Sequence, residues 1–343
     1  MIVKNEAHVI RRCLRSVRPF IDSYSISDTG STDNTMELIR EELAGIPGVL
    51  VSDPWQDFGT NRQTALERCV GDHVLFIDAD ETLECTDAVL RLPSEYDGFT
   101  IRLVQSTATF LRTVIIRNDP RWRWRRKIHE ELVFDGAHTT LNLHSAVIRS
   151  YDDSHRNLLG DKFVRDLAVL ESMPPTQENV FYLAQTLFGL NRYAEAIQKY
   201  EERAALGGWE EEVYYSLFMA GTLRTSYSAD SFETKAASLF RAFIYRPQRM
   251  EALSALCQLL RENGKNAEAY RLSLVEPKPT TDTHFASPRA GWRIFEEHAL
   301  AAYFLEMFEE ARRYFVRILE FDLNDEDRDR TLANIGYCDA KLL

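Results

Sequence analysis

The chain has 343 residues, enough for two domains, and a formal net charge of −12, which argues against nucleic acid as its main partner. Its five cysteines are scattered and include no Cys-x-x-Cys pair, which argues against a disulfide framework or a zinc site and favours a reducing compartment. Because the sequence contains neither an apolar run long enough for a membrane span nor a signal-peptide pattern at its start, we expect a cytoplasmic protein without a transmembrane segment.

The first part of the chain alternates short apolar runs with stretches of helical periodicity. Strands are predicted at 1–3, 24–27, 49–51 and 74–77, and helices at 6–17, 34–43 and 59–69. The repeated strand–helix order predicts a doubly wound α/β fold with a mostly parallel sheet. Since a first strand of three residues is short for such a sheet, we expect the natural chain or its relatives to carry several more residues before Met1.

Asp28 and Gly30, after the second predicted strand, have the chemistry of a nucleotide site. Asp28 can accept hydrogen bonds from a base or ribose, and Gly30 lets a ligand approach the backbone closely. Asp33 or Thr32 in the same segment can cap the next helix, which is a structural role. Arg62, near a helix start, suits a phosphate or ribose, although a solvated surface Arg is equally common. The sequence has neither Gly-x-Gly-x-x-Gly nor a Walker loop, which argues against a dinucleotide enzyme or a P-loop NTPase.

The apolar run Val74–Ile77 ends in three carboxylates within four residues, those of Asp78, Asp80 and Glu81. The run predicts a central strand of a parallel sheet, and ligands of such sheets bind beyond the carboxyl ends of the strands. Carboxylates this close repel one another unless a cation lies among them, and Mg²⁺ or Mn²⁺ is commonly held by one or two carboxylates plus substrate phosphates. The pattern predicts a metal–diphosphate site; an acidic loop that caps a helix near Thr86 is the structural alternative.

Four segments, in this order and spacing, resemble the family 2 glycosyltransferases of the GT-A fold. They are Ile2–Glu6, Asp28–Asp33, Asn61–Gln63 and Phe76–Glu81. The resemblance implies a donor pocket lined by residues from all four segments: Val3, Asn5, Glu6, Asp28, Gly30, Arg62, Asp78 and Ala79. It also implies that Asp78 and Asp80 form an Asp-x-Asp pair that holds Mn²⁺ or Mg²⁺ on the diphosphate of a nucleotide sugar, with a UDP-sugar as the expected donor.

Beyond two further predicted strands, at 99–104 and 113–117, a segment of alternating Arg and Trp runs into Ile128-His129-Glu130. A strand with Trp on one face and Arg on the other is the structural interpretation, and a cationic wall near the diphosphate or acceptor is the functional one. The segment is similar to one in lipopolysaccharide-core glucosyltransferases, which implies that His129 or Glu130 is a site residue. Because successive strand residues point to opposite faces, both can reach one substrate only if the strand has ended by Ile128.

The resemblance further implies inversion at the anomeric carbon by direct displacement with one general base. Glu130 is the first candidate for this base and Glu81 the second. His129 is the expected third metal ligand, and His144 and His155 are its alternatives.

From about Gly160 onward strand patterns disappear and small residues recur in helical contexts. These residues are Ala196, Ala236, Ala269 and Ala311, at spacings of 40, 33 and 42. The spacings bracket the tetratricopeptide period of about 34 residues and predict four degenerate repeats. We therefore expect a GT-A catalytic domain over 1–158 and a helical-repeat domain over 159–343, with a linker at 277–282. This layout also resembles the glycocin peptide S-glycosyltransferases, and the repeats offer a surface for acceptor choice or homo-oligomerisation.

The leading hypothesis is a metal-dependent inverting glycosyltransferase that moves a sugar from a nucleoside-diphosphate sugar to a glycan, lipid or peptide. The alternative from another class is a helical scaffold that binds a protein partner and carries a catalytically silent nucleotide domain. The retained carboxylates of Asp28, Asp78 and Asp80 argue against that alternative. A nucleotidyltransferase is a third interpretation, but the Gly-rich basic loop it needs is missing around Lys4.

Overall fold

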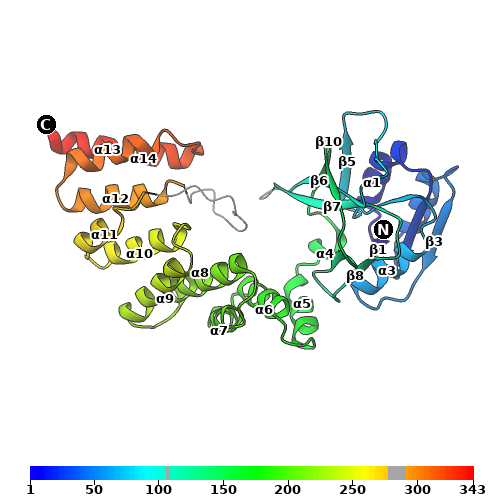
Figure 1. The fold of residues 1–343 in the computed structure, drawn as a ribbon, viewed down its shortest axis with the longest axis horizontal. Helices are drawn as coiled ribbons and strands as arrows, with labels where there is room; N and C mark the ends of the chain where they lie inside the picture. The colour runs from blue at the N-terminus through cyan, green and yellow to red at the C-terminus, as the bar shows by residue number, and fades with distance from the viewer. Residues whose placement is uncertain (106–108, 277–290) are drawn as a thin grey trace. The chain divides into compact units, whose positions relative to one another are not determined.

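The computed structural model describes residues 1–105, 109–276 and 291–343, which divide into two compact units, Met1–Val169 and Leu170–Leu343. The first unit is mixed α/β and the second is helical (Figure 1). This order confirms the predicted fold class. The boundary expected at 158/159 lies before helix α5 (Lys162–Glu171), whereas the two units meet within that helix. The linker expected at 277–282 lies outside the described residues.

Three parallel strands form the first sheet of the α/β unit. They are β1 (Ile2–Val3), β2 (Tyr24–Asp28) and β3 (Gly48–Ser52), in the order β1-β2-β3. The helices that follow them are α1 (Ile10–Val17), α2 (Thr35–Glu42) and α3 (Phe58–Glu67), with the 3-10 helix η1 (Arg18–Phe20) after α1. α1 buries Ile10, Cys13, Leu14 and Val17, as its periodicity predicts, and it ends two residues before Pro19.

Five strands form the second sheet, in the order β4-β7-β6-β10-β5. They are β4 (His73–Leu75), β5 (Glu81–Cys85), β6 (Gly98–Val104), β7 (Thr109–Arg117) and β10 (Thr140–Ser150). β6 and β10 are parallel, and the other neighbours are antiparallel. A separate hairpin consists of β8 (Trp122–Arg125) and β9 (Glu131–Phe134), and the short helix α4 (His155–Leu158) precedes α5. β6 and β7 contain the predicted strands, whereas β5 and β10 were not predicted.

The strand before the acidic segment is not the central parallel strand that its sequence predicted. β4 is an edge strand whose partner among the described strands is β7, and the two are antiparallel. Val74, Phe76 and Ile77 are nevertheless buried. Their burial comes from packing against α3, β7 and β8 and against the core of the second sheet. An apolar run therefore predicted burial correctly, but it did not predict the strand's partners.

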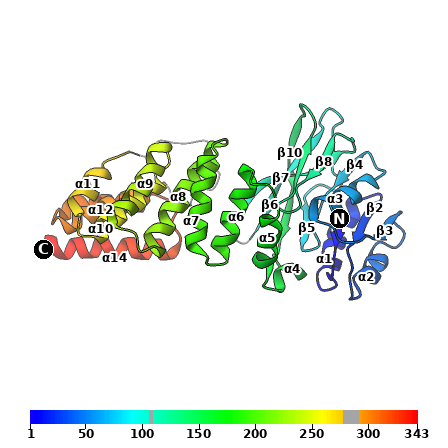
Figure 2. The same cartoon turned by 90° about the horizontal axis from the view of Figure 1, so that it is seen from below.

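The second unit consists of antiparallel helix pairs (Figure 2). Its helices after α5 are α6 (Gln177–Gly189), α7 (Tyr193–Ala205), α8 (Glu210–Tyr227), α9 (Phe232–Tyr245), α10 (Glu251–Glu262), α11 (Asn266–Leu272), α12 (Arg293–Phe304), α13 (Phe308–Ile318) and α14 (Asp325–Leu342). α6 contacts α7, α8 contacts α9, α10 contacts α11, α12 contacts α13, and α14 packs on α13. Within the described ranges no residue after Gly160 is in a strand, as predicted.

The four small residues that marked the repeats occupy equivalent places. Each lies in the second helix of a pair: Ala196 in α7, Ala236 in α9, Ala269 in α11 and Ala311 in α13. Ala196, Ala269 and Ala311 have no exposed surface, and Ala236 packs against the same helical core. These alanines let paired helices approach closely, which is the role that the sequence predicted. In the described parts of the chain, no helix has the length and apolar content needed to cross a membrane.

Candidate functional site

Asp28 is the last residue of β2, and its carboxylate is only half satisfied. Oδ1 accepts hydrogen bonds from the backbone N–H of Gly30 at 3.0 Å and of Ser31 at 2.9 Å. Oδ2 is buried and has no hydrogen-bond partner among the described residues. A buried carboxylate oxygen is costly to leave unpaired, so this atom needs a donor from beyond the described residues. A ribose hydroxyl or a base N–H supplies such a donor.

The loops around Asp28 are held together by their own hydrogen bonds. Asn5, in the left-handed region at φ 58°, donates its N–H to the Ser31 hydroxyl at 2.9 Å and accepts from the Thr32 N–H at 2.7 Å. The Val3 carbonyl accepts from the Thr29 N–H, while the Val3 side chain lies in the core. Gly30 has a φ of 103° and no atom near the position of a Cβ, so its backbone is open to a ligand.

Glu6 is a buried carboxyl that joins β1 to the start of α4. Its N–H donates to the Thr35 hydroxyl at 2.8 Å, and its Oε2 accepts from the His155 N–H at 3.2 Å. Burial, with a smaller contribution from the charge of Asp80, raises the pKa of Glu6 to about 7. The structure places Glu6 near Asp80, as a common site requires.

Arg62 of α3 bridges the carboxylates of Asp78 and Glu130. The guanidinium contacts Asp78 Oδ1 at 2.7 Å and donates from Nε to Glu130 Oε1 at 2.8 Å. It also lies 5.2 Å from the ring centroid of Trp124. Burial alone would raise the pKa of Asp78, but the positive charges around it, chiefly those of Arg62 and Arg112, outweigh burial and the pKa is lowered. Arg62 was predicted as a donor-binding residue, whereas its bridge between these two carboxylates was not.

Asp80 is mostly buried and is held by the start of α4. The hydroxyl and the N–H of Ser154 hydrogen-bond to its carboxylate, and its carbonyl accepts from the Tyr151 N–H at 3.1 Å. Burial and the nearby charge of Asp78 raise the pKa of Asp80. Ala79 between the two carboxylates points into the core of the first sheet, so it offers a ligand only its backbone.

Glu81 is unsuited to the role of general base. It begins β5, where the sequence had indicated a loop, and only 3% of its surface is exposed. Its carboxylate accepts hydrogen bonds from the Asp78 N–H at 3.0 Å and from Arg112 at 2.8 Å. Burial and the charge of Asp78 raise its pKa. These contacts hold the Asp78 backbone in place and leave Glu81 without access to an acceptor, so this second candidate is a structural carboxylate.

His129 and Glu130 lie in the turn between β8 and β9. β8 has ended at Arg125, and His129 adopts a φ of 50°, so the condition for placing both side chains near one substrate is met. Before the turn, Trp122 and Trp124 are less exposed than Arg123 and Arg125, which is the alternation that the structural interpretation predicted.

α3 fixes this turn beside Arg62. Phe58 donates its N–H to the Lys127 carbonyl at 3.1 Å. A Cβ on Gly59 would collide with the carbonyl oxygen of Arg126, so the close approach of helix and turn requires glycine here. Glu130 therefore reaches Arg62 because α3 and the hairpin touch.

The predicted metal set of Asp78, Asp80 and His129 does not assemble. In the described ranges no group of three or more His, Cys, Asp or Glu side chains is arranged to hold a metal ion. Burial and the charges of Lys162, Arg156 and Arg126 lower the pKa of His129 to about 4, and the same cations repel a metal. The role of His129 as a metal ligand therefore stays a prediction.

Asp80 does fit a divalent ion that is shared with a diphosphate, because its carboxylate is crowded by that of Asp78 and such ions need only one or two protein carboxylates. The alternative ligands have other positions: His144 is exposed on β10, and His155 begins α4. Ser154 and Arg112 were not predicted as part of the site, since neither stands in a motif and both reach it through tertiary contacts.

Comparison with known proteins assigns the first sheet and the acidic segment to a family. The model of the family described as "Glycosyl transferase family 2" matches residues 1–97, which include Asp28, Arg62 and the Asp78–Glu81 segment. Residues 1–97 are thus similar to glycosyltransferase family 2. The family 2 match ends before the hairpin that carries Glu130.

Three curated relatives have matching segments. A "TPR repeat-containing protein" of Synechococcus elongatus is 34% identical over 139 residues, which cover 38% of this chain and 34% of that protein. The "SPbeta prophage-derived glycosyltransferase SunS" of Bacillus subtilis is 25% identical over 214 residues, 57% of this chain and 50% of SunS. The "Lipopolysaccharide core biosynthesis glycosyltransferase LpsC" of Rhizobium meliloti is 34% identical over 85 residues, 24% of this chain and 31% of LpsC. The chain thus spans half or less of the length of these relatives.

A solved tetratricopeptide repeat protein of Thermus thermophilus aligns with 52% of this chain and 92% of its own, at 17% identity and a TM-score of 0.36. The chain combines an N-terminal segment that matches glycosyltransferase family 2 with a C-terminal array of helix pairs.

Proposed function

We propose that the chain is a glycosyltransferase that moves a sugar from a nucleoside-diphosphate sugar, a UDP-sugar foremost, to a glycan, lipid or peptide acceptor. The observation that carries the proposal is the buried, unpartnered Oδ2 of Asp28, which lies beside the open backbone of Gly30 at the end of β2. This atom requires a hydrogen-bond donor, and a nucleoside has one. The family 2 match over the same residues supports a sugar nucleotide as the source of that nucleoside.

The acidic segment is the expected position of the diphosphate. Asp80 would hold Mn²⁺ or Mg²⁺, and the ion would offset the charge that develops on the departing nucleoside diphosphate. Arg62, held against Asp78 at 2.7 Å, places a permanent positive charge at the same location. Arg126, Arg156 and Lys162 around His129 add further positive charge on the side of the hairpin. Together these groups favour binding of a doubly charged leaving group.

Glu130 is the proposed general base. Its carboxylate would take the proton of the acceptor nucleophile as that nucleophile bonds to the anomeric carbon and the bond to the diphosphate oxygen breaks, with inversion at carbon. The hydrogen bond from Arg62 at 2.8 Å orients the carboxylate. Of the two predicted bases, Glu130 is the one whose side chain lies in a turn rather than in the core.

The proposal is tested by incubating the protein with a panel of nucleotide sugars and measuring the release of nucleoside diphosphate. We expect release with at least one donor, dependence on Mn²⁺ or Mg²⁺, and loss with a chelator. Asp80→Asn should lower the rate on the order of 100-fold, the size of effect that follows loss of one charge-stabilising group. Asp87→Asn, an exposed carboxylate just after β5, is the matched control and should have no effect.

Full activity of Asp80→Asn in the presence of chelator would refute the metal assignment. The absence of both binding and turnover with every donor would instead favour the catalytically silent scaffold.

A further inference from the structure

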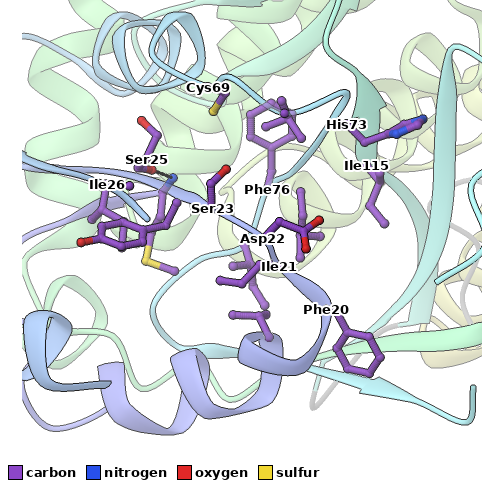
Figure 3. Close-up of a pocket in the computed structure, with 18 of the residues that line it drawn as sticks. Phe20, Ile21, Asp22, Ser23, Ser25, Ile26, Cys69, His73, Phe76 and Ile115 are labelled. Atoms are coloured by element: carbon purple, nitrogen blue, oxygen red, sulfur yellow. Dashed lines mark hydrogen bonds between the residues drawn. The ribbon is translucent and has the colours of Figure 1, made fainter. Parts of the chain in front are cut away.

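A cavity of about 680 Å³ in the first unit is not lined by the proposed general base (Figure 3). Aromatic and aliphatic side chains such as Phe20, Ile21 and Phe76 line it instead, and Glu130 is not among its lining residues. We therefore expect an acceptor that approaches Glu130 to bind outside this cavity, on the hairpin of β8 and β9 whose turn carries that residue.

The outward face of this hairpin carries a row of exposed cations. Arg123 and Arg125 alternate along β8 with Trp122 and Trp124. The two tryptophans pack in the core, so both arginines lie on the solvent face about 7 Å apart. Lys127, two positions beyond Arg125, is exposed as well. Arg123, Arg125 and Lys127 form the cationic row.

The cationic row has no ion pair with any carboxylate among the described residues. The other arginines of the hairpin region are paired, Arg121 with Asp119 at 2.7 Å and Arg126 with Glu131 at 3.4 Å. Glu131 lies opposite Arg125 in the β8–β9 register, yet its printed contact is with Arg126. Since Asp and Glu outnumber Lys and Arg by 53 to 41, the row is unpaired in a chain with abundant carboxylates.

An unpaired cationic row on an acidic protein favours an anionic ligand. The net charge of −12 does not attract anions, so a local group of cations is needed to hold one. Arginine presents its donors in a planar fork that matches the oxygen atoms of a phosphate or carboxylate group. Negative groups spaced along a linear ligand could therefore contact successive side chains of the row.

Three other anionic partners match the row less well. Single-stranded nucleic acid needs exposed aromatic rings for its bases, whereas Trp122 and Trp124 are turned inward. A membrane surface needs apolar side chains beside the cations, and the outward residues of β8 are both arginine. An extended peptide needs a free strand edge, but the Trp124 N–H already donates to Gln63 Oε1 of α3 at 2.9 Å.

We propose that the cationic row binds an anionic glycan, whose phosphate or carboxylate groups contact these three side chains. The inference rests on the proposed function, because it selects the glycan among the acceptor classes and gives it negative charge. The row ends in the turn that carries Glu130, and the Phe58 N–H of α3 holds this turn through the Lys127 carbonyl at 3.1 Å. A glycan bound along the row would be anchored on the element that carries the proposed base.

The test measures the binding of small probes to the full chain by calorimetry, without a donor, at low and at high salt. The probes are a trisaccharide of galacturonic acid, a trisaccharide with two phosphate monoesters, and uncharged maltotriose. Phosphatidylglycerol vesicles and polyglutamate represent the membrane and the acidic peptide.

Three double variants are compared with wild type. Arg123→Gln/Arg125→Gln removes the charges, and Arg123→Lys/Arg125→Lys keeps them but loses the planar fork. Arg40→Gln/Arg91→Gln is the matched control, because both arginines are exposed in the same unit and have no ion pair among the described residues. Melting temperatures show that each variant is folded.

We expect at least one anionic trisaccharide to bind wild type and the Arg40/Arg91 control equally, more weakly at high salt, and maltotriose not to bind. The glutamine pair in the row should weaken binding about tenfold or more, and the lysine pair should weaken it less.

The inference is overturned if neither anionic trisaccharide binds more tightly than maltotriose, or if the glutamine pair in the row binds like wild type. It is also overturned if vesicles or polyglutamate bind through the row more tightly than the trisaccharides do. Glycan binding through the row without release of nucleoside diphosphate from any donor would contradict the proposed function and still support the row as a glycan site.

Discussion

Arg62 connects two parts of the site that are far apart in the sequence. Its guanidinium forms an ion pair with Asp78 Oδ1, before β5, at 2.7 Å. Its Nε donates a hydrogen bond to Glu130 Oε1, in the β8–β9 turn, at 2.8 Å. Burial works to lower the pKa of Arg62, but the two carboxylates outweigh it and raise that pKa, so the arginine stays charged. We expect a bound diphosphate to compete with Asp78 for this cation, which would couple donor binding to the position of Glu130.

Glu130→Gln should lower transfer by about 10²- to 10⁴-fold while donor affinity changes little, because the amide keeps the shape of the carboxylate but cannot take a proton. Transfer rates and donor affinity are measured on the same samples. Glu131→Gln is the matched control, since Glu131 is the neighbouring and more exposed carboxylate. Near wild-type transfer by Glu130→Gln would place the general base elsewhere.

Glu6 should make stability depend on pH. Its pKa is about 7 when folded, against a usual 4.5, so the folded state binds more protons between these values. Stability contributed by the protonated form is therefore present below pH 4.5 and is lost as the pH rises to about 7. Glu6→Gln should remove this loss. Its free energy of unfolding should therefore exceed that of wild type by an amount that grows from pH 5 to pH 8 and reaches up to about 3 kcal/mol.

Urea unfolding at pH 5, 6, 7 and 8 in chelator-containing buffer measures the effect of Glu6→Gln. Identical pH profiles for the two proteins would show that burial does not perturb Glu6.

At the scale of elements, local sequence patterns predicted which face of a helix or strand is buried better than they predicted which strands pair with one another. Alternation of Trp and Arg predicted β8 and its buried face, and helical spacing predicted α1 and the repeat helices. The partners depend on tertiary contacts that leave no local signal. Glu81 therefore appeared as part of a loop although it starts β5, and β10 was not predicted although it lies between β6 and β5.

The small residues of the repeats provide a stability test. Ala196→Leu in α7 adds three heavy atoms where no surface is exposed, so it should cost about 1–3 kcal/mol by overpacking. Ala205→Leu is the control, since Ala205 is exposed at the end of the same helix. Urea unfolding followed by helical circular dichroism measures both variants. Equal stability of the two would contradict the assignment of Ala196 to the interface of a helix pair.

For the whole molecule, the net charge is negative, whereas positively charged side chains gather at the candidate site. The total of −12 argues against nucleic acid, yet Arg62, Arg126, Arg156 and Lys162 gather around the hairpin and the acidic segment. The sequence indicated the carboxylates of this site because they form motifs. It did not indicate how cations would neutralise them, since Arg62 reaches Asp78 and Glu130 only after α3, the acidic segment and the hairpin have packed together.

The central claim is that Asp28 binds the nucleoside of a sugar nucleotide. Thermal shift with nucleotide sugars and Mn²⁺ tests it most directly, in wild type, in Asp28→Asn and in the surface control Asp87→Asn. A donor at 100 times its dissociation constant should stabilise wild type and Asp87→Asn by about 2.7 kcal/mol, a readily measured shift. Asn can still accept from the Gly30 and Ser31 N–H groups, but it loses the charged acceptor, so Asp28→Asn should bind about 10- to 100-fold more weakly. An equal shift in all three proteins would contradict the claim.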